Sequence, residues 1–182
     1  MLPTHHQEQT PSAWVCRHAG LIRPGGRVLD VAAGSGRNTC WLSGLGLQVE
    51  AVDRDEAALH SMLGIANIQT RVADLENSAW PYAGEKFDAI VVCRYLYRPL
   101  LPLLAQCLAP QGVLIYETFM LGHEAYGRPQ NPDFLLKPNE LLEVFMPVLK
   151  PVAFEQGLIR EPQAAVIQRI CAVENTAEPV IL

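Results

Sequence analysis

Val28-Leu29-Asp30-Val31-Ala32-Ala33-Gly34-Ser35-Gly36 is the stretch of sequence that decides the fold of this chain. Its first four residues are typical of a buried strand, and the small residues after them predict a tight turn. Helical spacing of apolar residues then resumes from Asn38 to Leu45. A strand, a small-residue turn and a helix in this order indicate the first unit of a doubly wound sheet.

The same alternation of strand and helix continues beyond this stretch. Further strands are expected at residues 47–52, 68–73, 87–93 and 113–118, with helices at 12–22, 56–63, 99–108 and 138–145. Residues 149–159 and 164–173 are spaced as an antiparallel hairpin, and 109–112 as a turn. We therefore predict an α/β fold with a Rossmann-like, doubly wound sheet of seven strands, mostly parallel and closed by the C-terminal hairpin.

Length and composition limit the class of protein. A chain of 182 residues suits a single domain, 1–182, with a flexible tail at 1–11 and a long loop at 120–138 over the substrate side. The net charge of −5 argues against nucleic acid as a partner, and no apolar run has membrane-spanning length. Five cysteines without CxxC pairing and no signal peptide predict a reduced, cytoplasmic protein. The pair His5 and His6 lacks companions at ligand spacing, so no metal site is expected, and the oligomeric state stays open.

Two carboxylates follow neighbouring strands of the predicted sheet. Asp53 ends the second strand and Asp74 follows the third, at the edge that also carries the turn around Gly34. A carboxylate at the second strand end can accept hydrogen bonds from both hydroxyls of a ribose, and Asp74 can accept one from an exocyclic amine. The three positions together predict an adenosine site.

The spacing of the glycine turn discriminates between adenosine cofactors. A dinucleotide fingerprint needs a third glycine where this chain has Thr39, and a pyrophosphate needs amide groups at a helix start. S-adenosylmethionine carries no phosphate and needs only room for its methionine end. The turn therefore favours S-adenosylmethionine, and an NAD-linked oxidoreductase is the alternative.

These motifs resemble those of class I S-adenosylmethionine-dependent methyltransferases. Residues 28–53 are similar to their first and acidic second motifs, 73–76 to their adenine-contacting loop, and 87–92 and 108–114 to their fourth strand and the turn into the fifth. The run Gly34 to Asn38 looks most like the branch of the tellurite-resistance and thiol methyltransferases. One position departs from the motif, since Ala32 stands where the family has glycine.

The resemblance implies a role for each residue of the motifs. Asp30 and the turn at Ala32 and 34–36 would contact the methionine end, and Asp53 would hold the ribose. Asp74 would accept from the adenine amine. The implied cofactor-binding set is Asp30, Ala32, Gly34, Ser35, Gly36, Asp53, Arg54, Asp74, Leu75 and Cys93. For Cys93 the contribution would be backbone, and core packing of its side chain is the stronger interpretation.

Candidate acceptor residues follow the fourth and fifth strands. Glu117 could act as a general base, with Tyr95 or Tyr97 positioning the acceptor, although packing beneath the loop is the slightly stronger interpretation for each tyrosine alone. Arg94, Arg98 and Arg128 suggest a small anionic acceptor, or else cations that pin the loop.

A further alternative is a methyltransferase-like module without activity. That alternative requires the loop at 120–138 to block the pocket.

Overall fold

The computed structural model describes residues 10–174. Residues 1–9 of the predicted tail at 1–11, including His5 and His6, lie outside the described residues. Seven strands form one sheet in the order β3-β2-β1-β4-β5-β7-β6. The strands are β1 Arg27–Val31, β2 Gln48–Asp53, β3 Ile68–Val72, β4 Phe87–Cys93, β5 Leu108–Phe119, β6 Leu149–Ile159 and β7 Ala165–Glu174. The helices are α1 Ala13–His18, α2 Arg37–Gly44, α3 Glu56–His60, α4 Leu101–Gln106 and α5 Glu140–Phe145.

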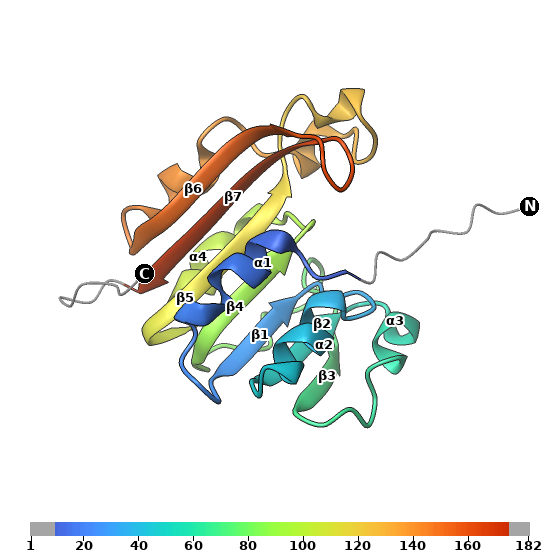
Figure 1. Ribbon diagram of the computed structural model, residues 1–182, viewed down its shortest axis with the longest axis vertical. Coiled ribbons are helices and arrows are strands. Elements are labelled where there is room, and N and C mark those ends of the chain that lie inside the picture. The colour runs from blue at the N-terminus through green and yellow to red at the C-terminus, as the bar shows by residue number, and fades with distance from the viewer. Residues whose placement is uncertain (1–9, 175–182) are drawn as a thin grey trace, which may run out of the picture.

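The pairing of the strands confirms the predicted sheet. Strands β1 to β5 are parallel, whereas β7 is antiparallel to both β5 and β6. The hairpin of β6 and β7 closes one edge of the sheet, as Figure 1 shows. This mixed sheet matches the expectation and differs from an all-parallel one.

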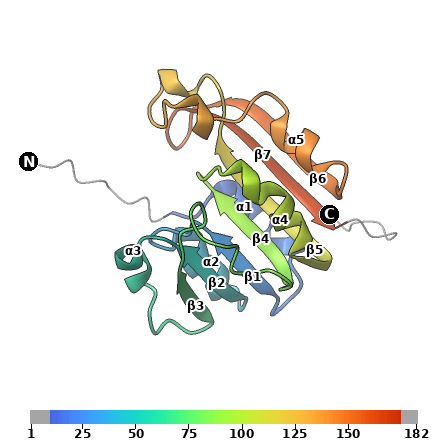
Figure 2. The same ribbon diagram turned by 180° about the vertical axis from the view of Figure 1, so that it is seen from behind.

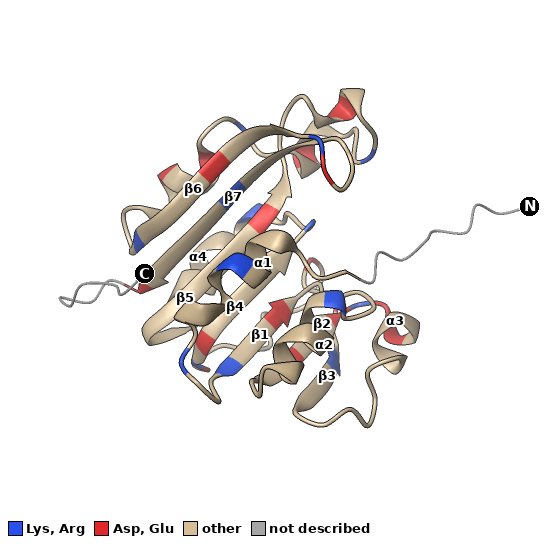
Figure 3. Cartoon of the chain, viewed as in Figure 1, with Lys and Arg blue, Asp and Glu red and all other residues tan. Residues whose placement is uncertain are grey.

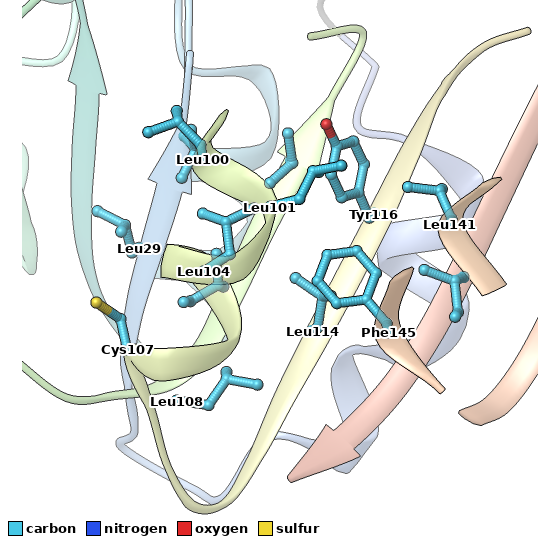
Figure 4. Packing of buried hydrophobic residues seen from close by; sticks show 14 of the residues in the cluster. Leu29, Leu100, Leu101, Leu104, Cys107, Leu108, Leu114, Tyr116, Leu141 and Phe145 are labelled. Carbon is cyan, nitrogen blue, oxygen red and sulfur yellow. The ribbon is translucent and has the colours of Figure 1, made fainter. Parts of the chain in front are cut away.

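Alternating side chains of each strand face two helical layers. On β1, Val28 packs with α1 and α2, while Leu29 and Val31 belong to the core beneath α4 and α5. Figure 2 shows α4 and α5 on the face opposite α1. In Figure 4 the leucines of α4 lie against β1 and β5, with Phe145 of α5 beside Leu114. Burial on both faces explains the nearly continuous apolar run of β4.

Strand β5 is longer than expected. The sequence predicts a turn at 109–112 before a strand at 113, yet the strand begins at Leu108. Leu108 pairs with Phe87 and Val113 pairs with Ala89, so the residues between them form an irregularity within the strand. Gln111 adopts a φ of 64° there, which explains why the segment resembles a turn in sequence.

The segment at 120–138 also differs from a structureless loop. It contains short 3-10 helices at His123–Ala125 and Pro132–Phe134, and Met120 bridges to Leu136. The backbone N–H of Leu136 donates to the carbonyl of Phe119. The segment therefore folds back on the end of β5 and lies against the edge where the candidate site is found.

Candidate active site

A cavity of about 410 Å³ opens at the carboxyl ends of the parallel strands. Asp53 after β2 and Asp74 after β3 line it together with Ala32, so the structure brings together the stretches that the sequence predicted to converge. Arg54 and Leu75 lie in the same wall. A second cavity of about 250 Å³ lies beside it and shares Ala32 and Arg94 with it; its lining is Asp30, Ala32, Ala33, Gly34, Ser35, Arg37, Asn38, Cys93 and Arg94.

The two glycines of the turn have different surroundings: Gly34 faces empty space, whereas Gly36 packs against protein. A Cβ built on Gly34, whose φ is 56°, would meet no protein atom within 4 Å. A Cβ on Gly36 would lie 2.0 Å from Sδ of Met62. Gly36 is therefore required by packing against the segment after α3, while Gly34 faces open space in the smaller cavity.

Ala32 takes a left-handed conformation with a φ of 54°. Such a conformation costs a residue with a side chain about 1–2 kcal/mol relative to the right-handed region. Glycine would avoid this strain. The departure from the motif at Ala32 therefore carries a cost in backbone energy. Arg94, at the end of the adjacent strand β4, has a similar φ of 57°, so two non-glycine residues with this geometry flank the cavities.

The two carboxylates of the larger cavity are held by backbone. Asp53 Oδ2 accepts from the N–H of Gly34 at 2.8 Å, and its Oδ1 accepts from the N–H of Asp55 at 2.9 Å. Asp74 accepts from the N–H groups of Glu76 and Asn77, and from the Asn77 side chain at 2.9 Å. The Asn77 amide and these backbone bonds lower the pKa of Asp74.

Because each carboxylate oxygen has two lone pairs, both aspartates retain acceptor capacity for a ligand. Asp74 is thus a turn cap that also faces the cavity.

Asp30 is a buried carboxyl beneath the glycine turn. It is 1% exposed, and Oγ1 of Thr39 in α2 donates to it at 2.6 Å. Burial raises its pKa to about 6, partly offset by the bond from Thr39. The bond ties the end of β1 to the first turn of α2 and so fixes the backbone that borders the smaller cavity.

The residues expected on the acceptor side separate into two groups. Arg94, Glu117 and Arg128 line a third cavity of about 190 Å³, and Tyr95 lines the larger one. Tyr97 and Arg98 are found in neither lining.

The side chains of Tyr97 and Arg98 stabilise loops instead. Oη of Tyr97 donates to the carbonyl of Glu76 at 3.1 Å. Arg98 pairs with Glu140 through two nitrogens, at 2.6 and 3.0 Å, and donates to the carbonyls of Asp133 and Leu135. This geometry corresponds to the loop-pinning alternative for Arg98.

Both oxygens of Glu117 accept hydrogen bonds. Oγ of Ser12 donates to one at 2.9 Å, and Nη1 of Arg169 donates to the other at 3.0 Å. Cys93, at the end of β4, is a free thiol whose pKa burial raises to about 12. A thiol with that pKa stays protonated at neutral pH, so its side chain is no nucleophile.

His123 has a place in the site that sequence reasoning missed. Its ring stacks on Phe119 with centroids 4.0 Å apart, one ring nitrogen contacts the Arg128 carbonyl at 3.0 Å, and the other accepts from the N–H of Val166. It joins the segment after β5 to β7 and lines the third cavity. No motif marks it: Phe119 and Arg128 are near in sequence, but Val166, which ties the ring to β7, lies 43 residues away.

Residues 28–112 match the family model described as "Methyltransferase domain". This match, which spans a little under half of the chain, agrees with the sheet order, the closing hairpin and the placement of Asp53, Asp74 and the glycine turn, all of which resemble the class I S-adenosylmethionine-dependent methyltransferases. The match favours a methyltransferase over the NAD-linked alternative. No curated protein matches the sequence.

Solved structures show the same fold. TehB from Haemophilus influenzae is 21% identical with a TM-score of 0.73; the alignment covers 88% of this chain and 61% of that one, so this chain spans less than two thirds of TehB. A TehB-like S-adenosylmethionine-dependent methyltransferase from Corynebacterium glutamicum is 17% identical, with a TM-score of 0.66 over 89% of this chain and 87% of that one. The N-methyltransferase NodS from Bradyrhizobium japonicum is 16% identical, with a TM-score of 0.66 over 88% and 95%.

Two further observations concern membranes and metal ions. No helix within residues 10–174 is long and apolar enough to cross a bilayer. Over the same residues, no three His, Cys, Asp or Glu side chains gather in a way that could hold a metal ion.

Proposed function

We propose that the chain transfers the methyl group of S-adenosylmethionine to a small anionic acceptor held in the third cavity. The observation that carries this proposal is the position of Arg94, which lines all three cavities. Arg128 lines the third cavity as well. An acceptor between these cations and a cationic cofactor gains electrostatic stabilisation when it carries negative charge.

The residues present fit the cofactor. The larger cavity offers carboxylates for a ribose and an amine, and the smaller one has open space above Gly34 for a methionine end. In this proposal Asp53 binds the ribose, Asp74 and Leu75 border the adenine, and Asp30 holds the turn. When bound, the cofactor supplies an electrophilic methyl group on a sulfonium.

An anionic nucleophile also fits the hydrogen bonding of Glu117. A lone pair of the acceptor forms the new bond to the methyl carbon while the carbon–sulfur pair returns to sulfur, so no proton has to leave. Both oxygens of Glu117, the predicted base for a neutral acceptor, already accept a hydrogen bond, one from Ser12 and one from Arg169. Burial raises the pKa of Tyr95, so its hydroxyl stays protonated at neutral pH in the wall of the larger cavity.

The loop at 120–138 lines the cavities without filling them. Pro129 and Phe134 contribute to the larger cavity, and His123 and Tyr126 to the third. An open pocket beside the loop supports an enzyme over the module without activity. Phe119, Ile159 and Pro162 make much of the third cavity apolar, which suits a small acid with an apolar body.

The test is methyl transfer from radiolabelled S-adenosylmethionine to matched acceptors. Small carboxylates, thiolates and oxyanions form one set, and neutral amines and alcohols of similar size form the other. We expect turnover with the anions, and Arg128→Ala to raise KM about tenfold or more with little change in affinity for S-adenosylhomocysteine. Turnover of neutral acceptors alone, unaffected by Arg128→Ala, would refute the proposal.

A further inference from the structure

Ser12 uses every polar atom it has. Its Oγ accepts from the N–H groups of Trp14 and Val15 and so caps α1, and the same Oγ donates to Glu117 Oε1 at 2.9 Å. Its own N–H donates to Oδ1 of Asn38 at 2.9 Å. The residue is 4% exposed, so these bonds form in an environment that water barely reaches. A serine needed only as a helix cap would require the first two bonds alone.

The partners of this segment lie in the walls of two cavities. Asn38 and Arg37 line the smaller cavity, where the methionine end is proposed to lie, and Nη1 of Arg37 donates to the carbonyl of Thr10 at 3.1 Å. Glu117 lines the third cavity. Residues 10–12, which we call the N-terminal strap, therefore join the cofactor side to the acceptor side. In Figure 1 the chain enters α1 past the end of α2 nearest the strand tips.

Glu117 is itself fixed from the other side. Arg169 of β7 bonds both Glu117 and Glu155, and Glu155 pairs with Arg17 of α1. Figure 3 shows acidic and basic residues alternating across β5, β7 and β6 beside α1. Because Arg169 holds the carboxylate in place, the Ser12 hydroxyl meets an acceptor that is already oriented, and its charge-assisted bond is stronger than one between neutral groups.

We propose that Ser12 is a positioning residue: its bond to Glu117 keeps the N-terminal strap fixed against Arg37 and Asn38, in the wall of the cavity proposed for the methionine end. Release of the strap then limits dissociation of the cofactor. This inference rests on the proposed cofactor placement. It predicts a coupling between a residue of the α1 cap and the lifetime of the bound cofactor product.

Three substitutions of Ser12 separate the strap from the helix cap. Ser12→Thr keeps a hydroxyl that can cap α1 and reach Glu117. Ser12→Asp keeps a good cap, but its carboxylate repels Glu117 and cannot donate. Ser12→Ala loses both. Glu155→Gln is the matched control, because it weakens the ion pairs of Arg169 without touching Ser12.

The experiment measures dissociation of S-adenosylhomocysteine from each purified full-length variant by stopped flow, beside its thermal unfolding midpoint. We expect Ser12→Asp to release the product about tenfold faster than the wild type while its midpoint stays within a few degrees. Ser12→Thr should restore the wild-type rate, and Glu155→Gln should change it less than twofold. Ser12→Ala should be both faster and less stable.

Two results would refute the strap proposal. One is a wild-type rate of product release for Ser12→Asp, and the other is product release from Glu155→Gln that is as fast as from Ser12→Asp. A wild-type protein that binds no S-adenosylhomocysteine would instead refute the cofactor placement, and the strap proposal with it. The two failures are therefore distinguishable.

Discussion

The carboxylate of Asp53 accepts the backbone N–H of Gly34 at 2.8 Å and thereby joins the end of β2 to the turn after β1. A family motif treats these two residues as separate contacts to a cofactor. In this structure they also contact each other, so the acidic residue helps to shape the glycine turn that lies beside it. Asp53 lines the larger cavity and Gly34 the smaller one, so the Asp53 side chain helps to shape the walls of both.

Asp53→Ala should weaken binding of S-adenosylhomocysteine by about 1.5–3 kcal/mol, through the loss of charge-assisted hydrogen bonds to the ribose. Asp53→Asn, which retains an acceptor for Gly34, should lose less. Isothermal titration calorimetry on both variants measures the difference. Unchanged affinity in a folded Asp53→Ala protein would contradict the ribose assignment.

Gly34→Ala and Gly36→Ala should fail in different ways. Both positions have a positive φ, so both substitutions carry backbone strain, but only the Cβ at 36 collides with Met62. Overpacking of this kind costs about 1–3 kcal/mol, so Gly36→Ala should be the less stable variant in urea unfolding. Gly34→Ala should lose more cofactor affinity than Gly36→Ala, when each loss is compared with the same variant's loss of stability. Equal stabilities would count against the packing role of Gly36.

Asp30 should make stability depend on pH. Its pKa is about 6 in the folded protein because of burial and near 3.8 when unfolded, so between these values the folded state holds a proton that the unfolded state has lost. Stability from this group is therefore present at low pH and lost as pH rises from about 4 to 6, by at most about 3 kcal/mol.

Asp30→Asn has no titrating group at this position and is the control. Urea unfolding of both proteins at pH 4.5, 5.5, 6.5 and 7.5 gives their difference in free energy of unfolding. The wild type should lose stability relative to the variant between pH 4.5 and about 6, and the difference should level off above that pH. A difference that stays constant with pH would show that Asp30 does not titrate as described.

Arg98→Ala should destabilise the protein by about 1–2 kcal/mol, since it removes a bidentate pair with Glu140 and two bonds to loop carbonyls. Arg98→Lys should recover little, because an ammonium cannot reproduce the fork. Hydrogen exchange should accelerate at residues 131–136. Arg128→Ala, made for comparison, should leave stability within about 0.5 kcal/mol. If Arg98→Ala matched Arg128→Ala in stability, the loop-pinning role would be wrong.

The sequence predicts the seven strands, their closing antiparallel hairpin and the strand ends at which the acidic residues lie. The ranges expected from the sequence for β4 and β6 are the ranges that the structure shows. Apolar runs predict strands well because they reflect burial directly. The placement of Asp53, Asp74 and the glycine turn at one edge follows from parallel strands whose carboxyl ends share that edge. These features depend on residues near one another in the chain.

Side-chain partnerships between distant residues came only from the tertiary structure. Glu117 lies 105 residues from Ser12, and Arg98 lies 42 from Glu140. A periodic pattern specifies which face of an element is buried, but a hydrogen bond forms only where two elements bring complementary atoms within about 3 Å. The sequence alone therefore determined a doubly wound sheet with Asp53, Asp74 and the glycine turn at one edge. Folding decided that Arg98 holds a loop and that Ser12 and Arg169 hold Glu117.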